Sequence, residues 1–153
     1  EGRRTVVEEV QGKLPETVWE MKAIEKNRLS VPKEYLEAIQ GGLIAVSQEP
    51  GGTAYWRRSS QVSMAGKTGT AQVVRLGRKR EKAEDMEYFS RDHAWFAAYA
   101  PIENPEIVVV VINEHSGHGG SKAAPIATKV IDAYFQLKQE RATYARAEKE
   151  GHP

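Results

Sequence analysis

The sequence predicts an α+β fold in which helices pack on one antiparallel sheet. Helical periodicity over residues 33–48, and again from about Lys122, brackets three stretches with strand composition, at 61–74, 93–100 and 107–112. This order, without alternating strand and helix crossovers, is typical of an antiparallel sheet. With 153 residues, 40% of them hydrophobic and 28% charged, the chain is long enough for one packed core.

Composition excludes several classes of function. The formal net charge of +1 gives no overall attraction to nucleic acid or anionic lipid. The absence of cysteine excludes disulfides, thiolate metal sites and a cysteine nucleophile. No apolar run approaches the roughly 20 residues that span a bilayer, and no signal peptide is present. Because the chain starts at Glu1 rather than at Met, we expect a segment whose targeting information lies upstream.

Residues 1–29 mix short apolar pairs with many charges, which indicates an irregular lead-in with short strands. Ser30-Val31-Pro32 then predicts a helix start, because serine can cap free N–H groups and proline is tolerated in a first turn. Apolar side chains follow at spacings of three and four, at Leu36, Ile39, Leu43 and Val46. This spacing predicts an amphipathic helix over residues 33–48. Gly41-Gly42 inside it is unfavourable by roughly 1 kcal/mol per glycine, which predicts a close backbone approach to a neighbouring element.

Three strands are expected next. Small and β-branched residues predict the first over 61–74. The stretches 93–100 and 107–112 are apolar on both alternating faces, which predicts strands buried on both sides. Turn residues between Pro101 and Pro105 favour an antiparallel hairpin of these two strands. The charged connection over 75–92 carries interleaved acidic residues, which favours a solvated loop over a nucleic-acid contact.

The glycines at positions 117, 119 and 120 predict a flexible loop before the last helix. That helix is expected from about Lys122, with Pro125 in its first turn. Its apolar stripe consists of Ile126, Val130, Ile131, Tyr134 and Phe135. After Lys138 the composition turns charged and rich in alanine, so residues 139–153 are expected to form a frayed tail. The residues between the lead-in and the tail, 30–138, are expected to form the folded part of a domain.

The stretch that carries chemistry runs Ala65-Gly66-Lys67-Thr68-Gly69-Thr70-Ala71-Gln72. Gly66-Lys67-Thr68 matches the end of a phosphate-binding loop, but Gln61 stands where that loop needs a glycine, and strand follows where it needs helix. The better match is the Lys-Thr-Gly element of serine acyl-transferases. There a lysine supplies positive charge near the nucleophile, and threonine hydroxyls hydrogen-bond a substrate carboxylate. The glycine leaves room for a peptide to lie along the strand.

Further blocks extend the match in order along the chain: Gly41-Gly42-Leu43 with Val46, Gly52-Thr53-Ala54, Gly66 to Gln72, Arg91 to Phe96, Tyr99-Ala100-Pro101, Val108 to Ile112, and Ala124 to Ala127. On these blocks, Val31 to Phe135 resembles the C-terminal part of the transpeptidase domain of class B penicillin-binding proteins, in particular the elongation-type penicillin-binding protein 2 group. The resemblance implies a partial β-lactamase/transpeptidase-like fold. It also implies a bacterial cell-wall D,D-transpeptidase that cross-links peptidoglycan stem peptides and is acylated by β-lactams.

The same resemblance implies roles for four residues. Lys67 would support an absent serine nucleophile electrostatically, Thr68, Gly69 and Thr70 would bind substrate, and the Thr70 N–H would form part of an oxyanion hole. We expect no cofactor and no metal. The resemblance implies a parent protein anchored in the membrane upstream, on the periplasmic or extracytoplasmic side of the inner membrane. The alternatives are a β-lactam-sensing or β-lactamase-type relative, and a non-enzymatic interaction module.

The family also needs a Ser-x-x-Lys nucleophile and a Ser-x-Asn element upstream of the Lys-Thr-Gly strand. Ser30-Val31-Pro32-Lys33 matches the first literally, but it lies too close to Lys67 in sequence, and a helix start explains its residues. No Ser-x-Asn occurs in the chain. We therefore expect the segment alone to be inactive, and to self-associate through apolar surface that the remainder of the domain would cover.

Two histidine positions have competing interpretations. His115 and His118, with Glu114, have spacing that suits a metal, but a strand-to-helix connection explains them more simply. Asp92-His93 either borders the cleft or forms a turn followed by a hydrogen-bonded strand-end histidine, and the second interpretation is favoured.

Overall fold

The computed structural model describes residues 2–5, 17–21, 24–26, 28, 30–75 and 85–149, with side chains described between residues 24 and 146 of these. The chain divides into two compact units, Glu1–Pro32 and Lys33–Pro153. In the first unit, β1 (Gly2–Thr5) pairs antiparallel with β2 (Thr17–Met21). The short strands predicted for the lead-in are therefore present.

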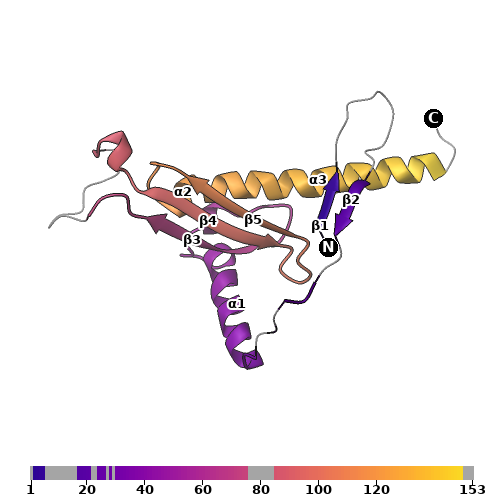
Figure 1. The fold of residues 1–153 in the computed structure, drawn as a ribbon, viewed down its shortest axis with the longest axis horizontal. Helices are drawn as coiled ribbons and strands as arrows, with labels where there is room; N and C mark the ends of the chain where they lie inside the picture. The colour runs from indigo at the N-terminus through magenta and orange to yellow at the C-terminus, as the bar shows by residue number, and fades with distance from the viewer. Residues whose placement is uncertain are drawn as a thin grey trace. The chain divides into compact units, whose positions relative to one another are not determined.

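The second unit contains a three-stranded antiparallel sheet and its helices (Figure 1). The sheet order is β3 (Ala65–Ala71), β4 (His93–Ala100) and β5 (Ile107–Asn113). The helices are α1 (Lys33–Gln48), α2 (Gly119–Lys122) and α3 (Ala124–Lys149), with 3₁₀ turns η1 (Tyr55–Arg57) and η2 (Tyr88–Ser90). This is the α+β architecture that the sequence predicts, although β3 is shorter than the predicted strand over 61–74.

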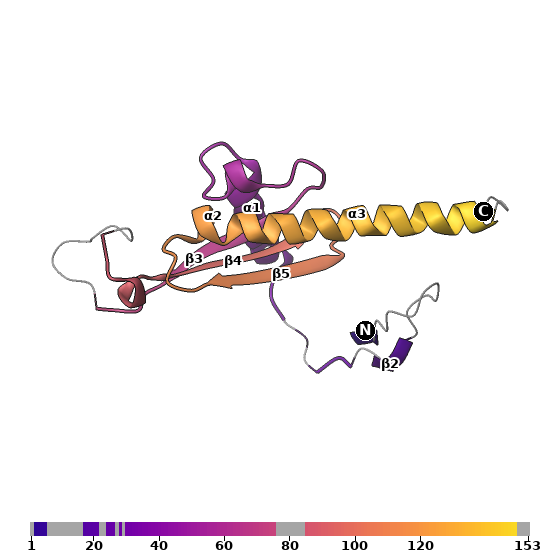
Figure 2. The same cartoon turned by 90° about the horizontal axis from the view of Figure 1, so that it is seen from above.

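The core lies between one face of the sheet and α3, which runs along that face (Figure 2). Register places Phe96 between Thr68 of β3 and Val111 of β5. The residues buried there are small apart from a few large side chains: Ala54, Met64, Ala94, Phe96, Ala98, Ala100, Val109, Ala123, Ala124, Ala127 and Ile131. Because most of them are alanines, the helix can approach the strands closely. We call this the covered face.

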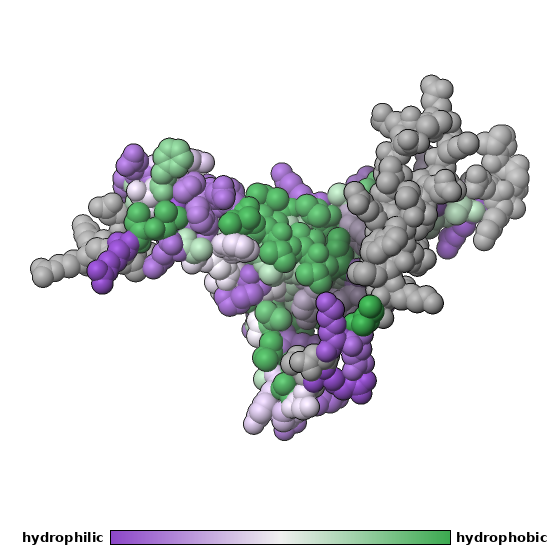
Figure 3. All heavy atoms as spheres, in the orientation of Figure 1, coloured by the Kyte–Doolittle hydropathy of each residue, from purple (hydrophilic) through white to green (hydrophobic). Residues whose placement is uncertain are grey.

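The opposite face of the sheet exposes apolar side chains. It consists of Trp95, Ala97 and Tyr99 on β4 with Val108, Val110 and Ile112 on β5. Val108 is 71% exposed and Val110 is 59% exposed, and Figure 3 shows the apolar patch over the sheet. The prediction that both strands are buried on both sides is therefore wrong within this chain. The reason is that α3 packs on one side of the sheet only, and no described element of the second unit covers the other side, which we call the open face.

Helix α1 has the bounds that the sequence predicts, but its surroundings differ from the prediction. It starts at Lys33, so Pro32 directly precedes the helix instead of lying in its first turn. A Cβ added at Gly41 or Gly42 would meet nothing within 4 Å. The predicted close approach at these glycines is thus not made by any described element. Among the described residues, the C-terminal end of α1 is the anchored part: buried Ser47 donates from Oγ to the Met64 carbonyl at 2.5 Å.

Helix α3 starts at Ala124, so Pro125 lies in its first turn as predicted. Two polar contacts fix it to the end of η1 and to the segment that follows. Ser59 Oγ donates to Asp132 Oδ1 at 2.5 Å, and Thr128 Oγ1 donates to the Arg57 carbonyl at 2.5 Å. The helix continues to Lys149, beyond the position where the sequence predicts fraying. Alanine, glutamate, lysine and arginine in this stretch have high helix propensity, which explains the extension.

Candidate active site

Strand β3 carries the Lys-Thr-Gly sequence along one edge of the sheet. Among the described residues its strand partner is β4, with Lys67 opposite Ala97 and Gly69 opposite Trp95. In the described part of the chain, the outer edge of β3 therefore offers backbone N–H and C=O groups to a further strand. An extended peptide can bind to such an edge by strand addition.

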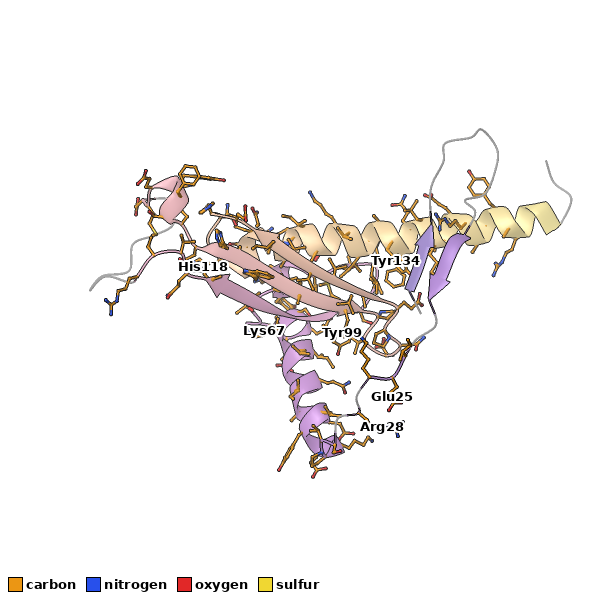
Figure 4. All side chains as sticks on the ribbon, in the orientation of Figure 1. Glu25, Arg28, Lys67, Tyr99, His118 and Tyr134 are labelled. Atoms are coloured by element: carbon orange, nitrogen blue, oxygen red, sulfur yellow. The ribbon has the colours of Figure 1, made fainter. Side chains whose placement is uncertain are left out.

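Consecutive side chains of β3 point to opposite faces of the sheet, as in any strand. Thr68 is opposite Phe96 on the covered face, and Lys67 is opposite Ala97 on the open face. Lys67, labelled in Figure 4, is exposed. Its Nζ donates to the Thr68 carbonyl at 2.7 Å. The sequence predicts that Lys67 shares one wall of the site with the residues that follow it. In the structure, the Lys67 and Thr68 side chains leave the strand on opposite faces of the sheet.

A cleft of ≈ 520 Å³ adjoins the threonines of β3, and we call it the threonine cleft. Its lining comes from three segments that are distant in sequence: Thr53, then Thr68, Gly69 and Thr70, then His118, Gly119, Gly120 and Ser121. Three of the four predicted site residues are thus brought together here, and Lys67 is not part of the lining. Hydroxyl groups of Thr53, Thr68 and Thr70 give the cleft donors and acceptors that suit a carboxylate.

Thr53 positions one of these hydroxyls. The two side-chain oxygens, Thr53 Oγ1 and Thr68 Oγ1, lie 2.9 Å apart and form a hydrogen bond. The turn that carries Thr53 is itself fixed to α1, because the Ala54 N–H donates to the Val46 carbonyl at 2.9 Å. The sequence did not assign Thr53, His118 or Ser121 to the site, since only tertiary contacts bring them to β3.

The start of α2 packs directly on the backbone of β3 and β4. A Cβ at Gly119 would lie 2.1 Å from the Trp95 carbonyl oxygen and 2.5 Å from that of Gly69. A Cβ at Gly120 would lie 2.2 Å from the Thr53 carbonyl oxygen. The sequence predicts a flexible loop at these glycines; the structure places them in α2, where the missing side chains permit close packing. In the sequence, the adjacent pair Gly119-Gly120 could have indicated this close packing of backbones.

The histidines considered for a metal site lie at different pockets. His118 lines the threonine cleft, whereas His115 lies with Glu114 at a second pocket near η2. Within the described ranges, no three His, Cys, Asp or Glu side chains are grouped closely enough to bind a metal ion. His93 begins β4, and its Nδ1 accepts a hydrogen bond from the His115 N–H at 2.9 Å, so the interpretation as a hydrogen-bonded strand-end residue is confirmed.

The literal Ser-x-x-Lys match does not form a catalytic pair in the structure. Ser30 is exposed and precedes α1, which begins at Lys33. Lys33 Nζ forms an ion pair with Glu37 Oε1 at 3.0 Å, and Ser30 lies outside the helix whose geometry would bring residues three positions apart together. This placement argues against Ser30 as a nucleophile.

Sequence comparisons identify relatives over most of the chain. The family described as the penicillin binding protein transpeptidase domain matches residues 5–132. The peptidoglycan D,D-transpeptidase MrdA of Haemophilus influenzae is 44% identical over 107 residues, which cover 67% of this chain and 16% of that protein. MrdA of Escherichia coli strain K12 is 36% identical over 87 residues, which cover 56% of this chain and 14% of that protein.

Solved structures agree with the sequence comparisons. Penicillin-binding protein 2 of Helicobacter pylori, in a complex with MreC, matches with a TM-score of 0.58 at 38% identity, over 69% of this chain and 18% of that one. Penicillin-binding protein 2 of Pseudomonas aeruginosa, in complex with WCK 5153, matches with a TM-score of 0.54 at 31% identity, over 80% of this chain and 24% of that one. The chain therefore spans a minor part of each relative. In the described residues, no helix has the length and apolar character needed to span a membrane.

Proposed function

This chain belongs to the penicillin-binding protein transpeptidase domain family, and from that membership we propose that its parent protein is a peptidoglycan D,D-transpeptidase of the penicillin-binding protein 2 type. The observation that carries the proposal is the Lys-Thr-Gly sequence on an edge strand, with Thr68, Gly69 and Thr70 lining a cleft. The substrates are peptidoglycan stem peptides, and β-lactams acylate the same site.

In this mechanism the residues of the chain bind and polarise the substrate. A stem peptide lies along the outer edge of β3, and its terminal carboxylate accepts hydrogen bonds from the hydroxyls of Thr68 and Thr70. Thr53 holds the Thr68 hydroxyl in orientation through their 2.9 Å hydrogen bond. The Thr70 N–H donates to the carbonyl oxygen as negative charge develops on it. Lys67, whose side chain leaves β3 on the open face, contributes positive charge close to the Thr68 backbone.

The nucleophile is a serine of the parent protein outside this chain. Its Oγ attacks the penultimate D-alanine carbonyl, loses its proton to a general base, and the terminal D-alanine leaves with a proton on its new amine. An amine of a second stem peptide then attacks the acyl-enzyme, forms the cross-link and regenerates the serine. On this proposal the isolated segment is inactive.

We propose that the remainder of the domain packs against the open face. Its exposed apolar side chains, with Val110 at 59% exposure near the centre, suit burial against another part of the same protein. Lys67 stands on this face, so whatever covers it also approaches the lysine. The parent protein is proposed to be anchored upstream and to act on the periplasmic or extracytoplasmic side of the inner membrane.

Labelling with a fluorescent penicillin tests the proposal on the chain alone and on the full-length parent. We expect the parent to be labelled and the chain to remain unlabelled. In the parent, Lys67→Ala should slow acylation by about a hundredfold, because it removes a charge aimed at the reacting groups. Lys129→Ala is the matched control, since Lys129 is exposed on α3 away from β3.

Two results would contradict the proposal. Labelling of the chain alone, abolished by Ser30→Ala, would mean that the nucleophile lies at Ser30. Absence of labelling in both forms would rule out the transpeptidase assignment itself.

A further inference from the structure

A second pocket, of ≈ 420 Å³, lies at the end of the sheet where β4 begins. It is lined by Tyr88, Arg91, Asn113, Glu114, His115, Ser116 and Lys122. We call it the arginine pocket. None of these residues lines the threonine cleft, but the stretch from the end of β5 through α2 contributes to both, with residues 113–116 here and 118–121 there.

The Arg91 guanidinium is held in place before any ligand arrives. Its Nε donates to the Met86 carbonyl at 3.1 Å, and its Cζ lies 5.7 Å from the centre of the Tyr88 ring. These contacts use one N–H of the group and orient its plane, while the terminal Nη donors form no hydrogen bond with described residues. A fixed guanidinium with free paired donors matches the geometry of a carboxylate.

His115 lines the pocket beside the backbone of Arg91 and adopts an unusual conformation. Its φ of 50° lies in the left-handed region, which a non-glycine residue adopts rarely and usually where the surroundings enforce it. Its N–H donates to His93 Nδ1 at 2.9 Å, and its own Nδ1 lies 3.2 Å from the Arg91 carbonyl oxygen. Because a carbonyl only accepts, Nδ1 carries the hydrogen, and Nε2 remains as the second polar atom of the ring.

Aromatic rings also lie close to His115. The centre of the His115 ring lies 5.2 Å from that of Tyr88, 5.6 Å from that of Phe89 and 4.5 Å from that of His93. On the other side of the connection, Ser116 Oγ donates to the Asn113 carbonyl at 2.6 Å. These contacts therefore hold the shape of the pocket by joining η2, the start of β4 and the β5–α2 connection.

The charges of the pocket favour an anion. Arg91 and Lys122 contribute two positive charges and Glu114 one negative charge, so the formal excess is positive. Within the described part of the chain, no carboxylate lies within ion-pair distance of either cation, Glu114 included. A ligand carboxylate could thus pair with both cations without displacing an existing partner.

We propose that the arginine pocket binds a carboxylate of an acidic peptide, with Arg91 as the bidentate donor and Lys122 as the second cation. Tyr88 and His115 provide the flanking surface for the peptide chain. The site is distinct from the Lys-Thr-Gly strand, because none of its lining residues lies on β3. Because the stretch from the end of β5 through α2 contributes to both pockets, a bound peptide contacts the segment that packs against Gly69.

Direct binding to the full-length parent protein tests the site. The probes are N-acetyl-Ala-Glu-Ala amide, which carries one carboxylate, and its glutamine counterpart, which carries none. Saturation-transfer NMR measures the affinity of both. We expect the acidic peptide to bind about tenfold more tightly, and Arg91→Gln to reduce this ratio to near one. Arg91→Lys keeps the charge but not the paired donors, so it should retain only part of the preference.

Arg141→Gln is the control, because Arg141 is an exposed cation on the distal part of α3. If Arg141→Gln lowered the affinity ratio of the two peptides as much as Arg91→Gln, the overall positive charge of the protein would explain the preference. That result would overturn the proposed site. So would an unchanged ratio in Arg91→Gln. Penicillin labelling of the same samples is read separately, so a failure of the proposed enzymatic function leaves the binding result interpretable.

Discussion

Gly66 stands where the sheet leaves no room for a side chain. A Cβ at this position would lie 2.6 Å from the Ala97 carbonyl oxygen and 2.8 Å from Phe96 Cζ. Gly42, by contrast, lies in α1 with nothing within 4 Å of an added Cβ. The two glycines look alike in the sequence, and only the packing around them separates a required glycine from a tolerated one.

Gly66→Ala should lower the free energy of unfolding of the chain by about 2 kcal/mol, because the added methyl overpacks the strand against Phe96. Gly42→Ala is the matched control and should raise that free energy by up to about 1 kcal/mol through helix propensity. Urea unfolding followed by circular dichroism measures both. Equal stability of Gly66→Ala and the unsubstituted chain would show that the strand relaxes around the methyl group.

At the scale of elements, helix periodicity was the reliable signal. It predicts α1 with the bounds Lys33–Gln48, and it places Pro125 in the first turn of α3. The extension of α3 to Lys149 was missed because a charged, alanine-rich composition suits both an exposed helix and a frayed tail. The prediction that both faces of β4 and β5 are buried was also wrong. Apolar residues on both faces show that a strand is able to be buried, but they do not show which element covers each face.

One contact joins α3 to the turn between β4 and β5. Lys138 Nζ donates to a carboxylate oxygen of Glu106, and this hydrogen bond raises the pKa of Lys138 above its ordinary value of 10.5, while desolvation acts in the opposite direction. Because the folded pKa is raised, the pair stabilises the fold fully below the pH at which the unfolded lysine titrates. The stabilisation is lost as the pH rises through the folded pKa, above 10.5.

Glu106→Gln should return the pKa of Lys138 toward its ordinary value, with little effect on stability at neutral pH, because the pair is on the surface. An NMR titration of the Lys138 ammonium group measures this shift. Gln136, on the same part of α3, hydrogen-bonds Glu140 instead, so Glu140→Gln is the control that should leave Lys138 unchanged. An identical titration of Lys138 in Glu106→Gln and the unsubstituted chain would refute the assigned cause.

At the scale of the whole molecule, the dominant feature is the open face. Its exposed aliphatic side chains, Val108, Val110 and Ile112, lie on β5, at the edge of the sheet opposite β3. An apolar sheet face with an adjacent unpaired strand edge in the described chain favours association. If the isolated chain self-associates, we therefore expect the open face to be the interface.

Val110→Lys should reduce self-association of the isolated chain, because it places a charge in the centre of the open face. Sedimentation velocity over a range of concentrations measures the effect. Leu137→Lys is the matched control, since Leu137 is an exposed apolar residue of α3 with 53% exposure. A monomeric unsubstituted chain at high concentration, or the same reduction in both variants, would argue against the open face as the interface.

The sequence alone determined the α+β class, the helix over residues 33–48, the β4–β5 hairpin and the Lys-Thr-Gly strand, because each depends on local periodicity or on consecutive residues. The tertiary structure alone decided that Thr53 and the start of α2 meet β3 at one cleft, and that Lys67 lies on the other face. It also decided which sheet face stays open. The physical reason is that contacts between distant segments depend on register and packing, which periodicity within one segment does not encode.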